Sequence, residues 1–159
     1  MKQEALIKKI QERFIQKKWT LTLAESCTGG AIAASLTKLS GSSQYFLGSL
    51  VTYSNAFKID WLDIEASLIQ TYGAVSEEVV KAMVKGLLKR TKSDFGIAVS
   101  GIAGPLGGTS EKPVGTVWIA VANGDFSTQT LLLSAIGNRE AIIEEATVSA
   151  LKLLIEFTN

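Results

Sequence analysis

Apolar residues recur with a helical period in three long segments of this chain. In the first, Leu6, Ile7, Ile10 and Phe14 stand among charged residues, which predicts a helix with one buried face. The three helices are expected over residues 3–17, 76–91 and 139–157. Ser76 stands where a hydroxyl would cap the N-terminus of the second.

Five other segments have the character of strands, because they are continuous apolar runs or are rich in β-branched and aromatic residues. They cover residues 20–24, 45–54, 94–100, 114–122 and 126–135. Shorter helices are expected over 31–39, 56–62 and 65–71, with Gly73 left-handed at the end of the last. Asn123-Gly124 favours a type I′ turn, and hence a hairpin of the last two strands. This order predicts an α/β fold: a three-layer α/β/α sandwich around a mixed sheet of about five strands.

The size and charge of the chain limit the classes of protein to which it can belong. A chain of 159 residues with 47% hydrophobic content suits one domain over residues 1–159. Sixteen Lys and Arg against fifteen Asp and Glu form no long run, so nucleic acid is not expected as a partner. No apolar stretch reaches the roughly 18 residues that span a bilayer, and residues 1–14 lack a signal sequence. We therefore expect a cytoplasmic protein without membrane contact. Its edge strands suit a homo-oligomer, with a dimer favoured.

The chain contains no histidine and a single cysteine. A Ser-His-Asp triad, a Cys-His pair, a His-ligated metal site and a thiolate zinc site are therefore excluded. If the protein is a hydrolase, its base must be Lys, Asp, Glu or Tyr.

The segment "LTLAESCTGG", residues 21–30, could present a nucleophile. Ser26 follows a strand and precedes a helix, so backbone N–H groups at the helix start could stabilise an oxyanion beside it. Alternatively, Ser26 and Thr28 cap the helix while the glycines form a tight turn. Cys27 is a further candidate, although such cysteines are more often packed as small hydrophobes.

The segment "TYSNAFK", residues 52–58, ends the second strand. If the first two strands are parallel neighbours, Tyr53 and Lys58 lie near Ser26 at one edge of the sheet. Lys58 could act as a base if burial lowers its pKa, and Tyr53 could relay the proton or hold the serine hydroxyl. The alternative is an ordinary tyrosine and a solvated lysine.

A glycine-rich loop, "SGIAGPLGGTSEKPVG", joins two strands over residues 100–115. It matches neither a Walker A nor a dinucleotide-binding motif, but its N–H groups could hold an anion. Lys112 could be a solvated charge of this loop. Arg139 begins the last helix, where a cation is unfavourable without an anionic partner such as a phosphate.

The segments "AESCTGG", "VTYSNAFK", "GAVSEEVV" and "SGIAGPLGGTSEKPVGTVW", in this order, closely resemble the CinA C-terminal domain family over nearly the whole chain. The chain looks like the stand-alone form, without the N-terminal domain of longer members. The resemblance implies a Ser/Lys amidohydrolase without metal or cofactor. Its implied substrate is a small-molecule nucleotide, nicotinamide mononucleotide, whose carboxamide becomes nicotinic acid mononucleotide and ammonia.

The resemblance also implies roles by position. Ser26 would be the nucleophile, Lys58 the base and Tyr53 its helper, and Arg139 matches a phosphate-contacting position. The implied substrate-binding positions are completed by Ser100 and Gly101 on one side and Thr28, Gly29 and Gly30 on the other. The chain departs from the usual pattern at Phe57, at "LDI" (residues 62–64) and at Leu106.

Two other functions stay open at this stage. One is a non-catalytic nucleotide-binding or interaction module linked to competence or DNA damage, and the other is an amidase for a different carboxamide.

Overall fold

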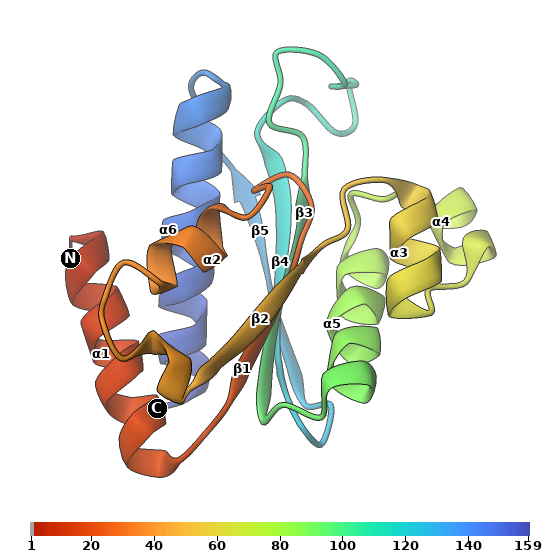
Figure 1. Ribbon diagram of the computed structural model, residues 1–159. Helices are drawn as coiled ribbons and strands as arrows, with labels where there is room; N and C mark the ends of the chain where they lie inside the picture. Colours follow the sequence, from red (N-terminus) through yellow and green to blue (C-terminus); the bar gives the residue numbers. More distant parts are fainter. Residues whose placement is uncertain (1) are drawn as a thin grey trace.

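The computed structural model describes residues 2–159 as a five-stranded mixed sheet between two layers of helices (Figure 1). The strands are β1 (Leu21–Glu25), β2 (Phe46–Val51), β3 (Phe95–Gly101), β4 (Thr116–Asn123) and β5 (Thr128–Ser134). The helices are α1 (Gln3–Lys17), α2 (Ala31–Leu36), α3 (Asn55–Leu62), α4 (Ala66–Tyr72), α5 (Glu77–Thr91) and α6 (Arg139–Phe157), with a short 3₁₀ helix at Ser42–Gln44. The predicted α/β/α sandwich is confirmed. None of the helices in residues 2–159 is long and apolar enough to cross a membrane.

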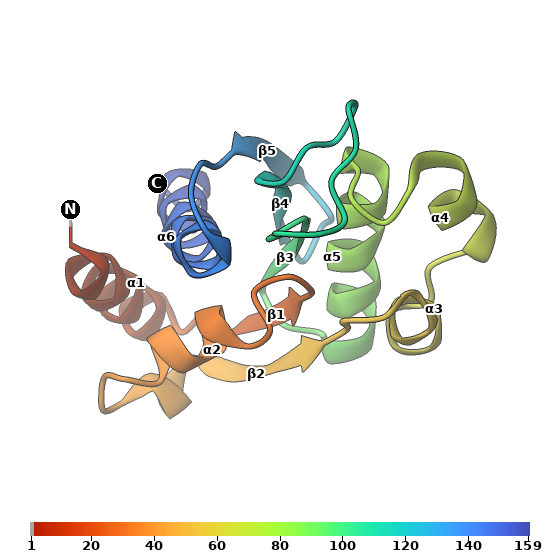
Figure 2. The ribbon, with the colours of Figure 1, turned by 90° about the horizontal axis from the view of Figure 1, so that it is seen from above.

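The strand order is β2-β1-β3-β4-β5, with β1 parallel to both β2 and β3 and the last two strands antiparallel. Glu25, the last residue of β1, lies opposite Val51 of β2 and Val99 of β3. The carboxyl ends of these three strands therefore meet at one edge of the sheet. The view from above shows the turn before α2, the start of α3 and the 102–115 loop gathered over this edge (Figure 2).

The two faces of the sheet carry side chains of different size. Toward α1, α2 and α6 the strands present Leu, Ile, Val and Phe, whereas toward α5 the buried strand residues are mainly alanines, with Leu50 and Trp118 partly buried beside them. The alanines are Ala24, Ala98, Ala120 and Ala122. Small side chains let α5 lie close to the sheet. Helix α3 in turn lies against α5 at Gly86, where a Cβ atom would overlap the carbonyl oxygen of Leu62. This close approach positions α3, which carries Lys58.

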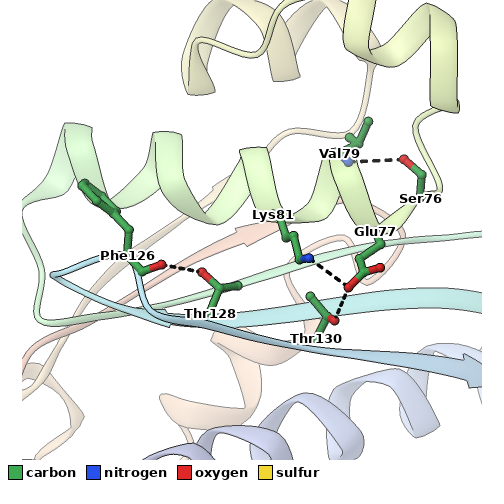
Figure 3. Close-up of polar contacts among 7 residues, drawn as sticks. All are labelled: Ser76, Glu77, Val79, Lys81, Phe126, Thr128 and Thr130. Carbon is green, nitrogen blue, oxygen red and sulfur yellow. Dashed lines mark hydrogen bonds and ion pairs between the residues drawn. The ribbon is translucent and has the colours of Figure 1, made fainter.

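The N-terminus of α5 is fastened to the sheet. The Ser76 hydroxyl accepts a 3.3 Å hydrogen bond from the Val79 N–H, so the predicted cap is confirmed (Figure 3). The Glu77 carboxylate accepts a 2.7 Å hydrogen bond from the Thr130 hydroxyl of β5 and pairs with Lys81 at 3.1 Å. These contacts hold the turn before α5 in place.

Several boundaries differ from those predicted. Strand β2 ends at Val51 instead of Ser54, because the Ser54 hydroxyl caps α3 by accepting a backbone N–H. Helix α2 ends at Leu36 instead of residue 39, where the Thr37 hydroxyl bonds back to helix carbonyls. Gly73 has a positive φ of 79°, but its ψ of 157° is extended and not left-handed helical, since the chain runs on toward the α5 cap.

The predicted type I′ turn at Asn123-Gly124 is wrong, although the hairpin exists. The Asn123 N–H donates to the Ser127 carbonyl beyond the last strand pair, which leaves a loop of three residues, 124–126. Phe126, with a φ of 65°, takes the left-handed conformation that Gly124 was expected to take. The Asn123 side-chain oxygen explains the difference, because it accepts 3.1 Å hydrogen bonds from the N–H groups of both Asp125 and Ser127.

Candidate active site

Ser26 and Lys58 meet at the shared edge of the sheet. Ser26 directly follows β1, and Lys58 lies on α3 after β2, so the parallel pairing of the two strands brings them together. The Lys58 Nζ lies 3.1 Å from the Ser26 Oγ, and the two residues are only 1% and 7% exposed. A potential nucleophile and a potential base are thus in direct contact, and both are largely buried.

Two backbone carbonyls hold the Lys58 amine beside Ser26. Its Nζ donates to the carbonyl oxygens of Thr52 at 3.0 Å and Tyr53 at 3.2 Å. Burial lowers the pKa of Lys58 from 10.5, with a smaller opposing effect from Cys27. A neutral amine has two N–H bonds for these carbonyls and one lone pair for the serine hydroxyl, so the geometry allows Lys58 to take the Ser26 proton.

Cys27 is the neighbour of Ser26 but is a poor nucleophile. Burial raises the pKa of its thiol to about 11, and the charge of Glu25 adds to this, while its own backbone N–H, Lys58 and Arg139 lower it. The reactive species is the thiolate, which this pKa makes scarce at neutral pH. Cys27 belongs to the buried core on the side of α1, α2 and α6 and contributes to the cavity wall.

The start of α2 does not offer the N–H groups that we expected for an oxyanion. The Glu25 carboxylate accepts hydrogen bonds from the N–H groups of Gly30, Ile32 and Ala33 at 3.0–3.1 Å. It also accepts from the Thr28 hydroxyl at 2.7 Å. The helix start is therefore occupied by a carboxylate of the chain itself, which corrects that expectation.

Beside Ser26, the backbone N–H groups of Cys27 and Thr28 donate to no other residue among residues 2–159. Buried N–H groups without partners are rare in folded proteins, and catalytic donors are one reason for them. Thr28, Gly29 and Gly30 are absent from the cavity wall, so the structure brings the turn near Ser26 without bringing these three residues to the cavity.

A cavity of about 270 Å³ opens beside Ser26 and Lys58. Its wall is formed by Ser26, Cys27, Tyr53, Asn55, Lys58, Ala74, Val75, Ser100, Gly101, Ile102, Ala103, Gly104, Leu106, Gly107 and Arg139. The predicted pair Ser100 and Gly101 lies in this wall. The Ser100 hydroxyl donates to the Ala74 carbonyl at 2.8 Å, and a Cβ on Gly101 would come within 2.7 Å of Val117. Both residues thus shape the wall. Residues 2–159 hold no cluster of His, Cys, Asp and Glu suited to a metal ion.

Tyr53 and Arg139 form a bridge at the cavity rim. The Arg139 guanidinium donates to the Tyr53 hydroxyl at 2.9 Å and to the Gly104 carbonyl at 2.8 Å. Within residues 2–159, Arg139 has no carboxylate partner, so its charge faces the cavity uncompensated. The Tyr53 hydroxyl contacts Arg139, and within residues 2–159 no hydrogen bond joins it to Ser26. Tyr53 contacts Lys58 through its backbone carbonyl instead.

The glycine-rich loop is anchored on both sides of the cavity. On one side Gly104 is bound by Arg139, and on the other the Lys112 ammonium donates to the Tyr72 carbonyl at the end of α4. Lys112 therefore also fastens the loop through an exposed hydrogen bond.

Sequence reasoning missed two residues of the site. Asn55 lies in the cavity wall one helical turn before Lys58, and its spacing of three residues from Lys58 on a helix was the available signal. Glu25 is fully buried beside Ser26, and a carboxylate at the end of an apolar strand was the signal there.

Comparisons with known proteins agree with this architecture. Residues 3–158 match the family described as CinA C-terminal domain. A protein of Leptospira biflexa named "CinA-like protein" is 47% identical over 92% of this chain, which spans only about a third (35%) of that relative. A protein of Enterobacter agglomerans named "Nicotinamide-nucleotide amidohydrolase PncC" is 48% identical over 86% of this chain and 83% of its own length.

Solved structures have the same fold. The crystal structure of the competence/damage inducible protein CihA from Agrobacterium tumefaciens superposes with a TM-score of 0.96 at 36% identity, covering 99% of this chain and 96% of the other. A CinA superfamily protein from Klebsiella pneumoniae gives a TM-score of 0.93 at 34% identity, covering 98% and 97%.

Proposed function

The chain belongs to the CinA C-terminal domain family, and from this premise we propose that it is a nicotinamide-nucleotide amidohydrolase. It cleaves the carboxamide of nicotinamide mononucleotide to nicotinic acid mononucleotide and ammonia. The observation that carries the proposal is the 3.1 Å contact between the Lys58 Nζ and the Ser26 Oγ in the wall of a cavity. The name of the Enterobacter agglomerans relative supports this choice of substrate.

Acyl transfer begins with neutral Lys58. Its lone pair takes the Ser26 proton as Oγ attacks the amide carbon, forming the C–O bond and an oxyanion. The N–H of Cys27, which follows the nucleophile in the chain and donates to no other residue, is the donor that we assign to that oxyanion. Protonated Lys58 then returns the proton to the amide nitrogen, the C–N bond breaks and ammonia leaves.

Water completes the cycle. Lys58, neutral again, takes a proton from water as its oxygen attacks the Ser26 ester. The ester C–O bond breaks, the proton passes back to Ser26 Oγ, and the product leaves as a carboxylic acid that loses its proton to solvent. These steps use only Ser26, Lys58 and water, and none of them requires a histidine, which the chain lacks.

Arg139 is the residue best suited to the substrate phosphate. It is a cation at the cavity rim without a carboxylate partner, and it is already oriented by Tyr53 and Gly104. A phosphate oxygen could accept from its guanidinium and from the Tyr53 hydroxyl together. This gives Tyr53 a binding role at its hydroxyl and a positioning role at its carbonyl, which holds Lys58.

The test is ammonia release from nicotinamide mononucleotide, nicotinamide riboside and free nicotinamide. Ser26→Ala should lower kcat by about 10,000-fold or more, and Lys58→Met by at least about 100-fold. Arg139→Met should raise KM about tenfold for the mononucleotide and leave KM for the riboside unchanged. Wild-type turnover by Ser26→Ala would refute the mechanism.

The same panel separates the alternatives. Turnover of another carboxamide in preference to the mononucleotide would make the protein a different amidase. Calorimetric binding of the mononucleotide without ammonia release would favour a non-catalytic module, a reading suggested by relatives named for competence or damage induction.

A further inference from the structure

Glu25 is a fully buried carboxylate that the proposed reaction does not use. It accepts five hydrogen bonds. Oε2 accepts from the Thr28 hydroxyl at 2.7 Å and from the N–H groups of Gly30 and Ile32 at 3.1 Å. Oε1 accepts from the Ala33 N–H at 3.0 Å and the Ser49 hydroxyl at 3.1 Å.

No lysine or arginine in residues 2–159 forms an ion pair with Glu25. Every one of its contacts is a donor, which is the environment of an ionised carboxylate. A buried charge is costly unless it is paired or fully hydrogen-bonded, so these five donors must stay in place around it. The carboxylate therefore acts as a clamp on the groups that surround it.

Four of the five donors belong to one short stretch, residues 28–33, which is the turn after Ser26 and the first turn of α2. Helix α2 has only six residues, and its N-cap, Gly30, offers no side-chain cap. Glu25 supplies that cap from five positions earlier in the chain. The fifth donor, Ser49, is on the neighbouring strand β2.

Ser26 lies between the carboxylate-bearing residue and the clamped turn. Its N–H donates to the Val99 carbonyl at 3.0 Å, and its carbonyl accepts from the Gly29 N–H at 3.0 Å. The path of the chain from Ser26 to Gly29 thus depends on where the Glu25 donors hold the turn. That path sets the position of the Ser26 Oγ relative to Lys58 and of the free Cys27 N–H.

We propose that Glu25 is a positioning residue for the nucleophile, holding the 26–30 turn so that the Ser26 Oγ and the Cys27 N–H keep the geometry that acyl transfer requires. This inference rests on the proposed amidohydrolase function. Misplacing a reacting group by about 1 Å can lower the rate by a factor of about 100. The gain in rate from holding this turn in place can therefore offset the cost of burying the Glu25 carboxylate.

Removing either of two donors to the Glu25 carboxylate distinguishes a role in positioning Ser26 from a role in stabilising the fold alone. The Thr28 and Ser49 hydroxyls each donate one hydrogen bond to Glu25, but only Thr28 lies on the turn. Thr28→Val and Ser49→Ala each remove one such bond. If Glu25 only stabilises the fold, both variants lower the melting temperature and neither changes kcat. If it positions Ser26, Thr28→Val lowers kcat and Ser49→Ala does not.

The experiment compares wild type, Glu25→Gln, Thr28→Val, Thr28→Ser and Ser49→Ala below the melting temperature of each. It measures kcat and KM for nicotinamide mononucleotide, and the rate at which a fluorophosphonate labels Ser26 with loss of fluoride, followed by mass spectrometry. We expect Glu25→Gln and Thr28→Val to lower both kcat and the labelling rate by about tenfold or more, with KM unchanged. Ser49→Ala should stay within about twofold of wild type, and Thr28→Ser, which keeps the hydroxyl, should recover most of the rate lost in Thr28→Val.

The other possible results separate a failure of the positioning role from a failure of the proposed substrate. Equal kcat in Thr28→Val and Ser49→Ala, or a change in KM alone, would overturn the positioning role. If Glu25→Gln does not fold, the Thr28 and Ser49 variants decide the question. If wild-type Ser26 is labelled but releases no ammonia, the proposed substrate fails while the labelling rates still test Glu25. A wild-type protein that is neither labelled at Ser26 nor active on the mononucleotide would overturn both proposals.

Discussion

The pH dependence of amide hydrolysis is the sharpest test of Lys58 as the base. Its amine must be neutral to take the Ser26 proton, and the structure buries it almost completely, at 1% exposure. Burial lowers the pKa of Lys58 from 10.5 because the charged form loses its water. We therefore expect kcat/KM to rise tenfold per pH unit at low pH and to level off above the pKa of Lys58.

The size of the effect follows from the neutral fraction. A lysine with the ordinary pKa of 10.5 would be neutral in about one molecule in a thousand at pH 7.5, a cost of about 4 kcal/mol. Each unit by which burial lowers the pKa increases that fraction tenfold and recovers about 1.4 kcal/mol of the barrier. The turning point of the profile should accordingly lie below 10.5.

The assay is ammonia release from nicotinamide mononucleotide between about pH 6 and 10, with three proteins. Wild type and Cys27→Ala should show the same rising limb, because the pKa of Cys27 is near 11, above this range. The residual activity of Lys58→Met should lack the limb. A flat wild-type profile, or the same limb in Lys58→Met, would show that another group titrates and would refute the assignment.

The lowered pKa also predicts a trend in stability. Between the folded pKa of Lys58 and 10.5 the unfolded chain binds more protons than the native one, so the free energy of unfolding should rise with pH in that window. Cys27 and Tyr45 oppose this at higher pH, because their raised pKa values of about 11 and about 12 keep protons on the native state. Urea unfolding of wild type and of Lys58→Met below about pH 9 measures the contribution of Lys58 to this pH dependence without that of Cys27 and Tyr45.

Three further predictions concern single side chains. The Tyr45 hydroxyl is fully buried without a hydrogen-bond partner, so Tyr45→Phe should raise the free energy of unfolding by about 1 kcal/mol in urea titration; a loss of stability would reveal an unseen partner. Gly86→Ala should lower the free energy of unfolding by about 2 kcal/mol or more, because its Cβ would overlap the Leu62 carbonyl and push α3 away from α5. The kcat of this variant should also fall, and unchanged stability would contradict this packing. Cys27→Ala should keep wild-type kcat within about threefold, whereas loss of activity on the scale of Ser26→Ala would make the thiol the nucleophile.

The elements of this fold were predictable because hydrophobic periodicity is a local property. The buried stripe of α1, with Leu6, Ile10 and Phe14, lies as its spacing predicted, and the Ser76 cap of α5 forms as expected. Errors arose where a side chain competed for the backbone. Ser54 ended β2 early, and Asn123 replaced the expected turn with a three-residue loop.

The candidate site was likewise predictable only in part from the sequence. Composition alone excluded histidine chemistry and directed attention to Lys58, and the motif around Ser26 identified a potential nucleophile. The contact between the two depends on the strand order β2-β1-β3, which is set by packing over the whole sheet. Burial of Lys58 against the Thr52 and Tyr53 carbonyls likewise comes from the packing of α3, and with it the lowered pKa.

The sequence by itself therefore determined which residue types were available and where the chain would be helical or extended, since both follow from neighbours within a few positions. Only the tertiary structure decided which of them meet. It joined the Tyr53 hydroxyl to Arg139 and filled the start of α2 with the carboxylate of Glu25. The physical reason is that hydrogen bonds and desolvation act over a few ångströms in space, whatever the separation of the residues along the chain.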